Sequence, residues 1–187
     1  MLWRSPEASI PKLRSALKTI GWFSWWSQII LSTISAVLLI FANSVTTNPT
    51  ALTIVGRALA LSGLAAAIAS TLWTVSYGRL AAKLGREVPM ESTKASEKAA
   101  SIAAVGTTIN IVGMLLCLLG AEAIVGTLAA KALTQATVTT GALVSSAVQP
   151  LDMLIVQANT NTIVVHFISL CANMRLRAAA AACALAT

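Results

Sequence analysis

Five polar side chains interrupt an apolar segment that is long enough to cross a lipid bilayer. The segment runs from Leu151 to Cys171, and the side chains that lipid disfavours most within it are Asp152, Gln157, Asn159, Asn161 and His166. Because the bilayer core has no water to bond to these groups, each is costly there unless it finds a partner. Polar residues in such positions bond to neighbouring helices or mark the path of an ion or substrate.

Polar residues of this segment, and one just beyond it, recur at every seventh position. We call four of them the polar stripe: Asp152, Asn159, His166 and Asn173. Residues seven apart in an α-helix differ by only about 20° around its axis, so the stripe follows one face. Gln157 and Asn161, four residues apart, form a second patch on nearly the opposite side. We therefore expect this helix to be enclosed by other helices or to border a watery cavity.

The polar stripe lacks the geometry of a catalytic or metal centre. At 1.5 Å of rise per residue, Asp152 and His166 are about 21 Å apart along the axis, too far for one metal ion or one acid–base pair. The chain has a single histidine, and no nucleophile, base and orienting group occur together, so we expect no enzyme. Asn159 and Asn161 lie near mid-membrane, and Asn110 in the third apolar stretch is the partner we predict for their carboxamides.

Two interpretations of the polar stripe remain open from the sequence. Its side chains either form hydrogen bonds between helices, each worth about 0.6 to 2 kcal/mol in lipid, or line a transport path or ion site. For His166 the alternatives are a hydrogen bond to a neighbouring helix, a contact with a metal or substrate, and axial ligation of a chlorophyll or haem. Chlorophyll and iron are therefore the candidate cofactors, and neither is established.

Composition indicates an integral membrane protein. The chain is 57% hydrophobic and 10% charged, whereas an average soluble domain is roughly a quarter charged. The net charge of +7 would suit a nucleic acid in a soluble protein, but the basic residues lie between apolar stretches, and we expect no nucleic-acid partner. A transmembrane helix needs about 20 apolar residues. Within a membrane domain of residues 21–177, we predict an all-α fold with four spans: 21–43, 58–78, 101–121 and 151–173.

Small residues predict where these helices pack closely. Gly106, Gly113 and Gly120 share one face of the third span, and Gly63 lies in the second. Small residues let helix backbones approach one another in lipid, so we expect helix contacts at these glycines. The cysteines, Cys117, Cys171 and Cys183, have no spacing typical of a metal or redox site and are expected to act as small apolar residues.

Basic residues predict the orientation of the chain in the membrane. Counted by connection, Lys and Arg number eleven on the side of the termini and the 79–100 loop, against two on the other side. Cytoplasmic loops hold the excess of basic residues, so we expect both termini and this loop on the stromal or cytoplasmic side. Three tryptophans at the start of the first span fit an aromatic belt at the membrane surface: Trp22, Trp25 and Trp26.

The segments outside the spans have predictions of their own. Residues 1–20 form a basic amphipathic segment, with Leu13 and Leu17 on one face, that rests on anionic lipid. Between Glu122 and Gln149 we expect an interfacial helix on the opposite surface, with a re-entrant segment as the alternative, followed by irregular chain. Residues 178–187 are an alanine-rich tail with no assigned role.

Several stretches resemble a family of chloroplast membrane proteins. The runs LAAKALTQ, from Leu128, and LDMLIVQANTNTIVVHFISL, from Leu151, are similar to the C-terminal half of that family. It is an inner-envelope family described both as a Tic translocon component and as the permease in chloroplasts, with relatives in cyanobacteria. The runs GWFSWWSQIILSTISAVLL and LWTVSYGRLAAKL are similar to its first two spans. The resemblance covers roughly residues 15–177 in the same order, and the stretch between Gln135 and Pro150 departs from it.

The resemblance implies a four-span protein of the chloroplast inner envelope, or of a cyanobacterial membrane, that acts in protein import, in iron transport or in both. It supplies no catalytic residues. The expected partners are the lipid bilayer and either other subunits of a translocon or further copies of the chain. The alternative is a structural or accessory subunit of a photosynthetic complex of the thylakoid, such as a photosystem supercomplex, with His166 in contact with a pigment.

Overall fold

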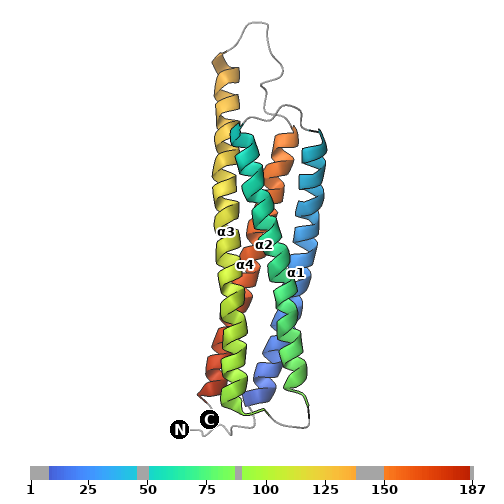
Figure 1. Ribbon diagram of the computed structural model, residues 1–187, viewed down its shortest axis with the longest axis vertical. Helices are drawn as coiled ribbons and strands as arrows, with labels where there is room; N and C mark the ends of the chain where they lie inside the picture. The colour runs from blue at the N-terminus through green and yellow to red at the C-terminus, as the bar shows by residue number, and fades with distance from the viewer. Residues whose placement is uncertain (1–8, 46–50, 87–89, 138–149, 186–187) are drawn as a thin grey trace.

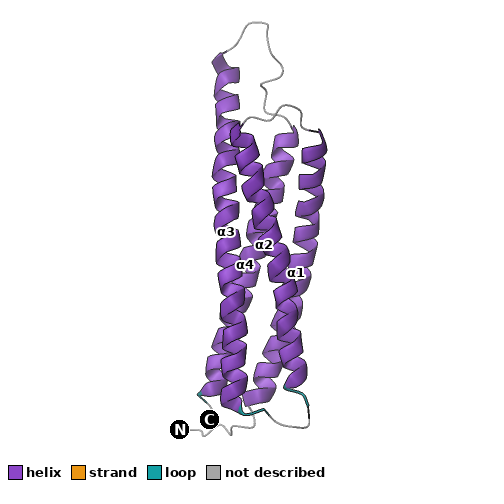
Figure 2. Ribbon diagram, in the orientation of Figure 1, coloured by secondary structure: helices purple, strands orange, loops and turns teal. Residues whose placement is uncertain are grey.

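The computed structural model describes residues 9–45, 51–86, 90–137 and 150–185, and in these residues it is a bundle of four helices without a strand (Figures 1 and 2). The helices are α1 (Ser9–Val45), α2 (Ala51–Lys83), α3 (Ser92–Thr137) and α4 (Pro150–Ala184). Each is long and apolar enough to cross a membrane, which confirms the predicted fold class. Because α1 begins and α4 ends beside the α2–α3 connection (Figure 1), we call this the terminal end and the opposite one the distal end.

The helices extend well beyond the predicted spans. They contain 37, 33, 46 and 35 residues, which correspond to about 50 to 69 Å of helix. The hydrocarbon core of a bilayer is only about 30 Å thick. Inside lipid, the sides of a helix that face the bilayer must be apolar, whereas a helix in water needs only one apolar face, which it buries. The mixed sequences flanking the spans satisfy that weaker condition.

The N-terminal segment is part of the bundle over the residues that the structure describes. From Ser9 onward it forms the first turns of α1, and its apolar side chains Leu13 and Leu17 are 1% and 0% exposed. They pack against Tyr77 and Leu80 of α2 and against several alanines at the terminal end. The segment is amphipathic as predicted, but its apolar face meets the bundle, and the prediction of a separate surface segment is corrected.

The helix predicted between Glu122 and Gln149 is a continuation of α3. Residues 122–137 extend α3 without a break, and its tip projects beyond the neighbouring helices at the distal end (Figure 1). Ile124 is buried there against Gly56 of α2, which holds the continuation in line. We therefore replace the interfacial helix and its re-entrant alternative by one long helix, and residues 138–149 of this connection lie outside the described part of the chain.

The alanine-rich tail is also structural. Through Ala184 it belongs to α4, with Ala180 and Cys183 buried. Ser96 of α3 donates a 2.6 Å hydrogen bond to the carbonyl of Ala180, a contact that small side chains on both helices permit. The tail closes the terminal end of the bundle.

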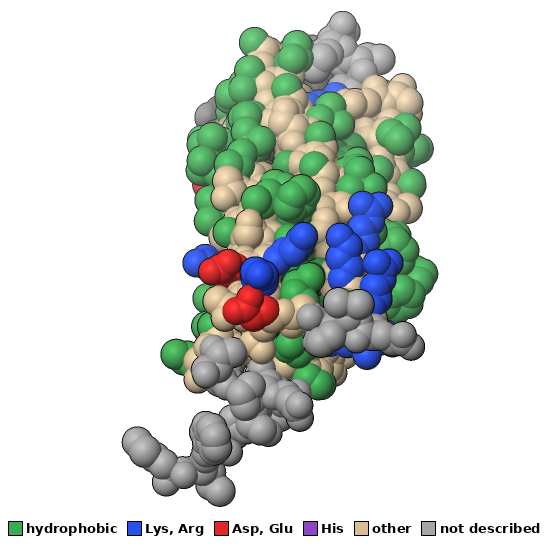
Figure 3. Space-filling view, turned by 60° about the horizontal axis from the view of Figure 1, so that its bottom comes forward, with side chains coloured by type: hydrophobic (Ala, Val, Ile, Leu, Met, Phe, Trp, Pro, Cys, Tyr) green, Lys and Arg blue, Asp and Glu red, His purple; other side chains and the backbone are tan. Residues whose placement is uncertain are grey.

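Exposed cations gather at the terminal end, where Figure 3 shows a band of basic side chains. Every helix contributes to it: Lys12, Arg14, Lys18, Arg79, Lys83, Arg86, Lys94, Lys98, Arg175 and Arg177 are all exposed. Trp22, Trp25 and Trp26 pack on one another one turn further along α1, with ring centroids 5.2 to 5.8 Å apart. The structure thus places both predicted surface signals at one end, and the compartment they face stays a prediction.

Candidate functional site

Polar side chains from three helices meet halfway along the bundle, between two apolar clusters. We call them the central cluster: Ser70 of α2, Asn110 of α3, and His166 and Ser169 of α4, all buried. The apolar cluster toward the terminal end includes Leu17 and Leu176. The one toward the distal end includes Leu64 and Ile155. The central cluster is therefore a polar layer that separates two apolar layers of the core.

Asn110 connects the members of the central cluster. Its side-chain nitrogen donates to the hydroxyl oxygens of Ser70 and Ser169, both at 2.8 Å, and lies 2.7 Å from the carbonyl oxygen of Gly106. Its side-chain oxygen lies 2.9 Å from Nδ1 of His166. The other ring nitrogen of His166, Nε2, lies 3.1 Å from the carbonyl oxygen of Gly63. One carboxamide and one imidazole therefore tie α2, α3 and α4 together.

Glycines make room for this arrangement. A Cβ on Gly113 would overlap the imidazole of His166 and lie 2.9 Å from Cβ of Ala66. A Cβ on Gly63 would overlap Sγ of Cys117. Gly106 lies against Tyr77 and Asn173, and Gly120 against the backbone of α2. The structure places each of the four predicted glycines at a close helix contact.

Three residues of the polar stripe, Asn159, His166 and Asn173, are buried and face the bundle. Asn173 accepts a hydrogen bond from the hydroxyl of Tyr77, and Asn159 donates one of 2.9 Å to the carbonyl of Cys117. The predicted pairing of Asn159 with Asn110 is wrong. Because α3 and α4 are antiparallel, the residue seven positions after Asn110 on α3 lies beside the residue seven positions before His166 on α4. Asn159 therefore meets Cys117, and His166 meets Asn110.

The second polar patch of α4 faces outward. Gln157 is exposed, and its amide nitrogen donates a 2.9 Å hydrogen bond to the side-chain oxygen of Asn161. Phe167 and Met174 of the same helix are also exposed, at 58% and 68%. The prediction that other helices enclose α4 is therefore wrong for one chain. Asn161 does not bond to Asn110, because it lies on this outward side, where Gln157 four residues earlier bonds to it instead.

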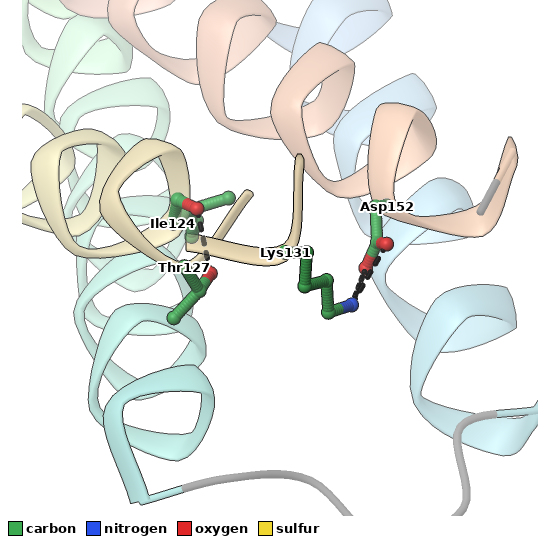
Figure 4. A network of polar contacts seen from close by, with 4 residues as sticks. All are labelled: Ile124, Thr127, Lys131 and Asp152. Carbon is green, nitrogen blue, oxygen red and sulfur yellow. Dashed lines mark hydrogen bonds and ion pairs between the residues drawn. The ribbon is translucent and has the colours of Figure 1, made fainter. Parts of the chain in front are cut away.

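Asp152 belongs to a separate charged site at the distal end. Lys131 of α3 reaches its carboxylate with N–O distances of 2.9 and 3.1 Å (Figure 4). Within α3, Thr127 donates a 2.6 Å hydrogen bond to the carbonyl of Ile124, one turn before Lys131 (Figure 4). Arg57 of α2, largely buried, donates a 3.4 Å hydrogen bond to Asn43. The polar stripe thus forms an ion pair at the distal end and hydrogen bonds between helices deeper in the bundle.

A polar face on α1 escaped the sequence analysis. Ser24, Gln28, Ser32 and Ser35 are all buried. Gln28 donates hydrogen bonds of 2.9 and 3.0 Å to Ser24 and to Thr74 of α2, and Ser35 donates one of 2.9 Å to the carbonyl of Ala158 on α4. The signal was their spacing of four, four and three residues, which places them on one helix face.

The site does not fit a pigment or metal ligated by His166. The ring is 0% exposed, and both nitrogens lie within hydrogen-bonding distance of oxygen atoms in the bundle, so neither is directed at the lipid. Among the described residues, no three His, Cys, Asp or Glu side chains group closely enough to hold a metal ion. A chlorophyll or an iron would have to displace Asn110 or Gly63.

Comparisons with known proteins agree with the resemblance seen in the sequence. The model of a family described as "Protein of unknown function (DUF3611)" matches residues 7–179. Over 173 residues, the chain is 35% identical to "Protein TIC 21, chloroplastic" of Arabidopsis thaliana. The match covers 89% of this chain and 57% of the relative, so the chain spans little more than half the length of that protein. No solved structure matches.

Proposed function

The chain belongs to the DUF3611 family, and from this premise we propose that it is a non-enzymatic membrane protein of a chloroplast transport assembly. Its membrane is the inner envelope or the equivalent cyanobacterial membrane, as the relative named TIC 21 and the sequence resemblance suggest. Its activity is the movement of iron, or of imported protein, across that membrane.

The polarity of the central cluster is the observation that supports this proposal. Close packing of four helices needs only small residues, and Gly63, Gly113 and Gly120 already supply them. Asn110 and His166 are more polar than such packing requires, and they lie in the middle of a membrane-length bundle. Polar and ionisable groups at this depth often mark the path of an ion or substrate.

The surface of α4 supports an assembly rather than a chain acting alone. Gln157 and Asn161 bond to one another on the outward side of α4, and the exposed Thr160 lies between them in the sequence. The central cluster, in contrast, is filled by side chains in direct contact. We therefore place the path between copies of the chain or between the chain and a partner subunit, along α4.

Iron uptake by proteoliposomes containing the purified protein tests the transport role. The native protein should take up radioactive iron above protein-free vesicles, and Gln157→Leu combined with Asn161→Leu, on the outward surface of α4, should abolish that uptake. Val164→Leu, an exposed position of the same helix, is the control for altered apolar volume. All three proteins should elute at the same size. If the double variant retains both iron uptake and protein import into plastids, the proposal is wrong.

The outward pair Gln157 and Asn161 also favours a second function, that of an accessory subunit of a photosynthetic membrane complex. Gentle purification from the native membrane distinguishes the two. Recovery with translocon subunits, or with copies of itself and bound iron, supports the transport role. Recovery with photosystem subunits and pigment supports the accessory role, and Gln157→Leu with Asn161→Leu should then weaken the association.

A further inference from the structure

His166 is chemically isolated in the bundle. Between the charged residues that bound the apolar part of each helix, α1 has no titratable side chain after Lys18. The corresponding parts of the other helices contain only four: Tyr77 of α2, Cys117 of α3, and His166 and Cys171 of α4. Tyrosine and cysteine become anions when they titrate, so His166 alone can become a cation there.

Both ring nitrogens of His166 lie against oxygen atoms. Nδ1 is 2.9 Å from Oδ1 of Asn110, and Nε2 is 3.1 Å from the carbonyl oxygen of Gly63. A neutral imidazole has only one N–H. One of these two contacts therefore opposes a ring lone pair to an oxygen lone pair whenever the ring is neutral.

Exchanging the two ends of the Asn110 carboxamide would move this conflict from His166 to Gly106 rather than remove it. The end assigned as nitrogen lies 2.7 Å from the carbonyl oxygen of Gly106, which can only accept a hydrogen bond. Reversing the amide would bring two oxygens to that distance. Since such assignments follow from the hydrogen-bond network, Gly106 fixes the oxygen of Asn110 toward His166.

We propose that His166 is a proton-binding site, and that the bound proton joins α4 to α2 and α3 at the same time. With two protons, the ring donates to both Asn110 and the carbonyl of Gly63. With one proton, the ring keeps the shorter hydrogen bond to Asn110 and loses the one to the carbonyl of Gly63. That carbonyl can still accept a backbone hydrogen bond within α2. Loss of the proton therefore loosens α2 from α4. This deepens the proposed function by naming the proton as a ligand of the same cluster, and it rests on that function only for the coupling to transport.

The surroundings of His166 allow the proton to leave. The residues found against the ring are Asn110 and Gly113 of α3 and Gly63 of α2, with Ser70 and Ser169 bonded to the same carboxamide, and none of them is charged. Asp152, the carboxylate of the same helix, lies about 21 Å away along the axis. Burial thus opposes the cation, the two facing oxygens favour it, and no carboxylate in the described part of the chain lies close enough to hold the proton permanently.

Two further buried polar atoms lie on the same face of α4 as His166. Oδ1 of Asn159 and Nδ2 of Asn173 are buried without a hydrogen-bond partner among the residues that the structure describes, one on each side of His166 at a distance of seven residues. Buried polar atoms are rarely left unsatisfied, so each is expected to bond to water. Water at these two positions would extend the central cluster toward both ends of the bundle.

Nitrogen NMR of the single histidine tests the site directly. Protein labelled with 15N-histidine and placed in lipid nanodiscs gives one pair of ring signals, because His166 is the only histidine. As the pH is raised within the range where the protein stays folded, the signals should change from imidazolium to the tautomer protonated at Nδ1. An unchanged neutral tautomer, or an unchanged imidazolium, at every pH overturns the proposal. The measurement involves no transport, so it can fail or succeed independently of the proposed function.

Asn110→Asp sharpens the test. It replaces the facing amide oxygen by a carboxylate of the same shape and should hold the imidazolium to higher pH. Asn43→Asp adds the same charge at the distal end beside Arg57 and should leave the transition unchanged. Equal transitions in both variants would contradict the assigned contact, and the titration of the native protein stands if Asn110→Asp fails to fold.

Cys117 reports the loosening of α2, because its sulfur lies against Gly63. In a protein lacking the other two cysteines, its labelling by a membrane-permeant maleimide should rise with pH. Thiol reactivity itself rises with pH, so the comparison is with His166→Gln, which cannot titrate. The native ring should give a several-fold larger rise than the glutamine variant. Identical pH profiles would overturn the coupling between the proton and the α2 contact.

Discussion

Gly113 of α3 lies directly against His166 of α4, and the imidazole ring occupies the space that a Cβ on Gly113 would need. The contact explains why a glycine and a histidine occur at these two positions. A side chain on α3 would displace the ring from Asn110 and Gly63, and a smaller residue in place of His166 would leave a cavity. The two residues therefore set the distance and the register between the helices.

The first prediction is that these residues are energetically coupled. Gly113→Ala should destabilise the protein by about 1 to 3 kcal/mol, as overpacking of a tight contact does. In a His166→Ala background, the same substitution should cost less, because the ring no longer occupies the space and only the close contact with Ala66 remains. Denaturation in mixed micelles measures both free energies, and additive effects of the two substitutions would contradict the contact. Gly126→Ala, a position with open space, is the control.

The second prediction concerns the corrected N-terminal segment. Leu17→Ala should destabilise the bundle by about 2 to 5 kcal/mol, because the side chain is fully buried in the terminal core. Phe23→Ala, at a position 66% exposed, should change the free energy of unfolding far less. If the segment rested on lipid, Leu17→Ala would instead weaken binding to anionic vesicles and leave the stability of the bundle unchanged.

The third prediction concerns the ion pair at the distal end. Lys131→Met removes the ion pair with Asp152 and should cost about 1 kcal/mol, since the side chains are 32% and 13% exposed. The exposed pair Lys94 and Glu91, at 74% and 61%, is the control, and Lys94→Met should cost little. Unfolding at low and high salt checks the assignment, since salt screens the exposed pair more strongly. Equal losses at both sites would show that burial does not strengthen the distal pair.

The number of helices followed from the sequence, but their ends did not. About 20 apolar residues in a row have one structural solution in a membrane, so four stretches predicted four helices. Beyond the lipid, the requirement falls to one apolar face, and the helix length depends on what that face meets. Leu13 and Leu17 had helical spacing, but only the fold shows that Tyr77 and Leu80 are their partners.

The candidate site was predicted in part, for a related reason. Recurrence every seven residues placed Asn159, His166 and Asn173 on one face, and the structure buries all three. Their partners depend on the offset between antiparallel helices, which close contacts such as Gly113 with His166 determine. No pattern within one helix contains that offset, so Asn110 was paired with the wrong residue of α4.

The last prediction is the sidedness of the membrane protein. Of the Lys and Arg residues that the structure describes, the terminal end has ten exposed, whereas the distal end has Arg57 and Lys131. An excess of basic residues remains on the cytoplasmic or stromal side during insertion. In a cysteine-free variant, Lys94→Cys and Arg177→Cys should therefore react with an impermeant maleimide from the stromal side only. Ala132→Cys, on the projecting tip of α3, should react from the other side only. Labelling of Lys94→Cys and Ala132→Cys from the same side would refute this arrangement, because about 57 Å of helix separates these positions, more than the thickness of a bilayer.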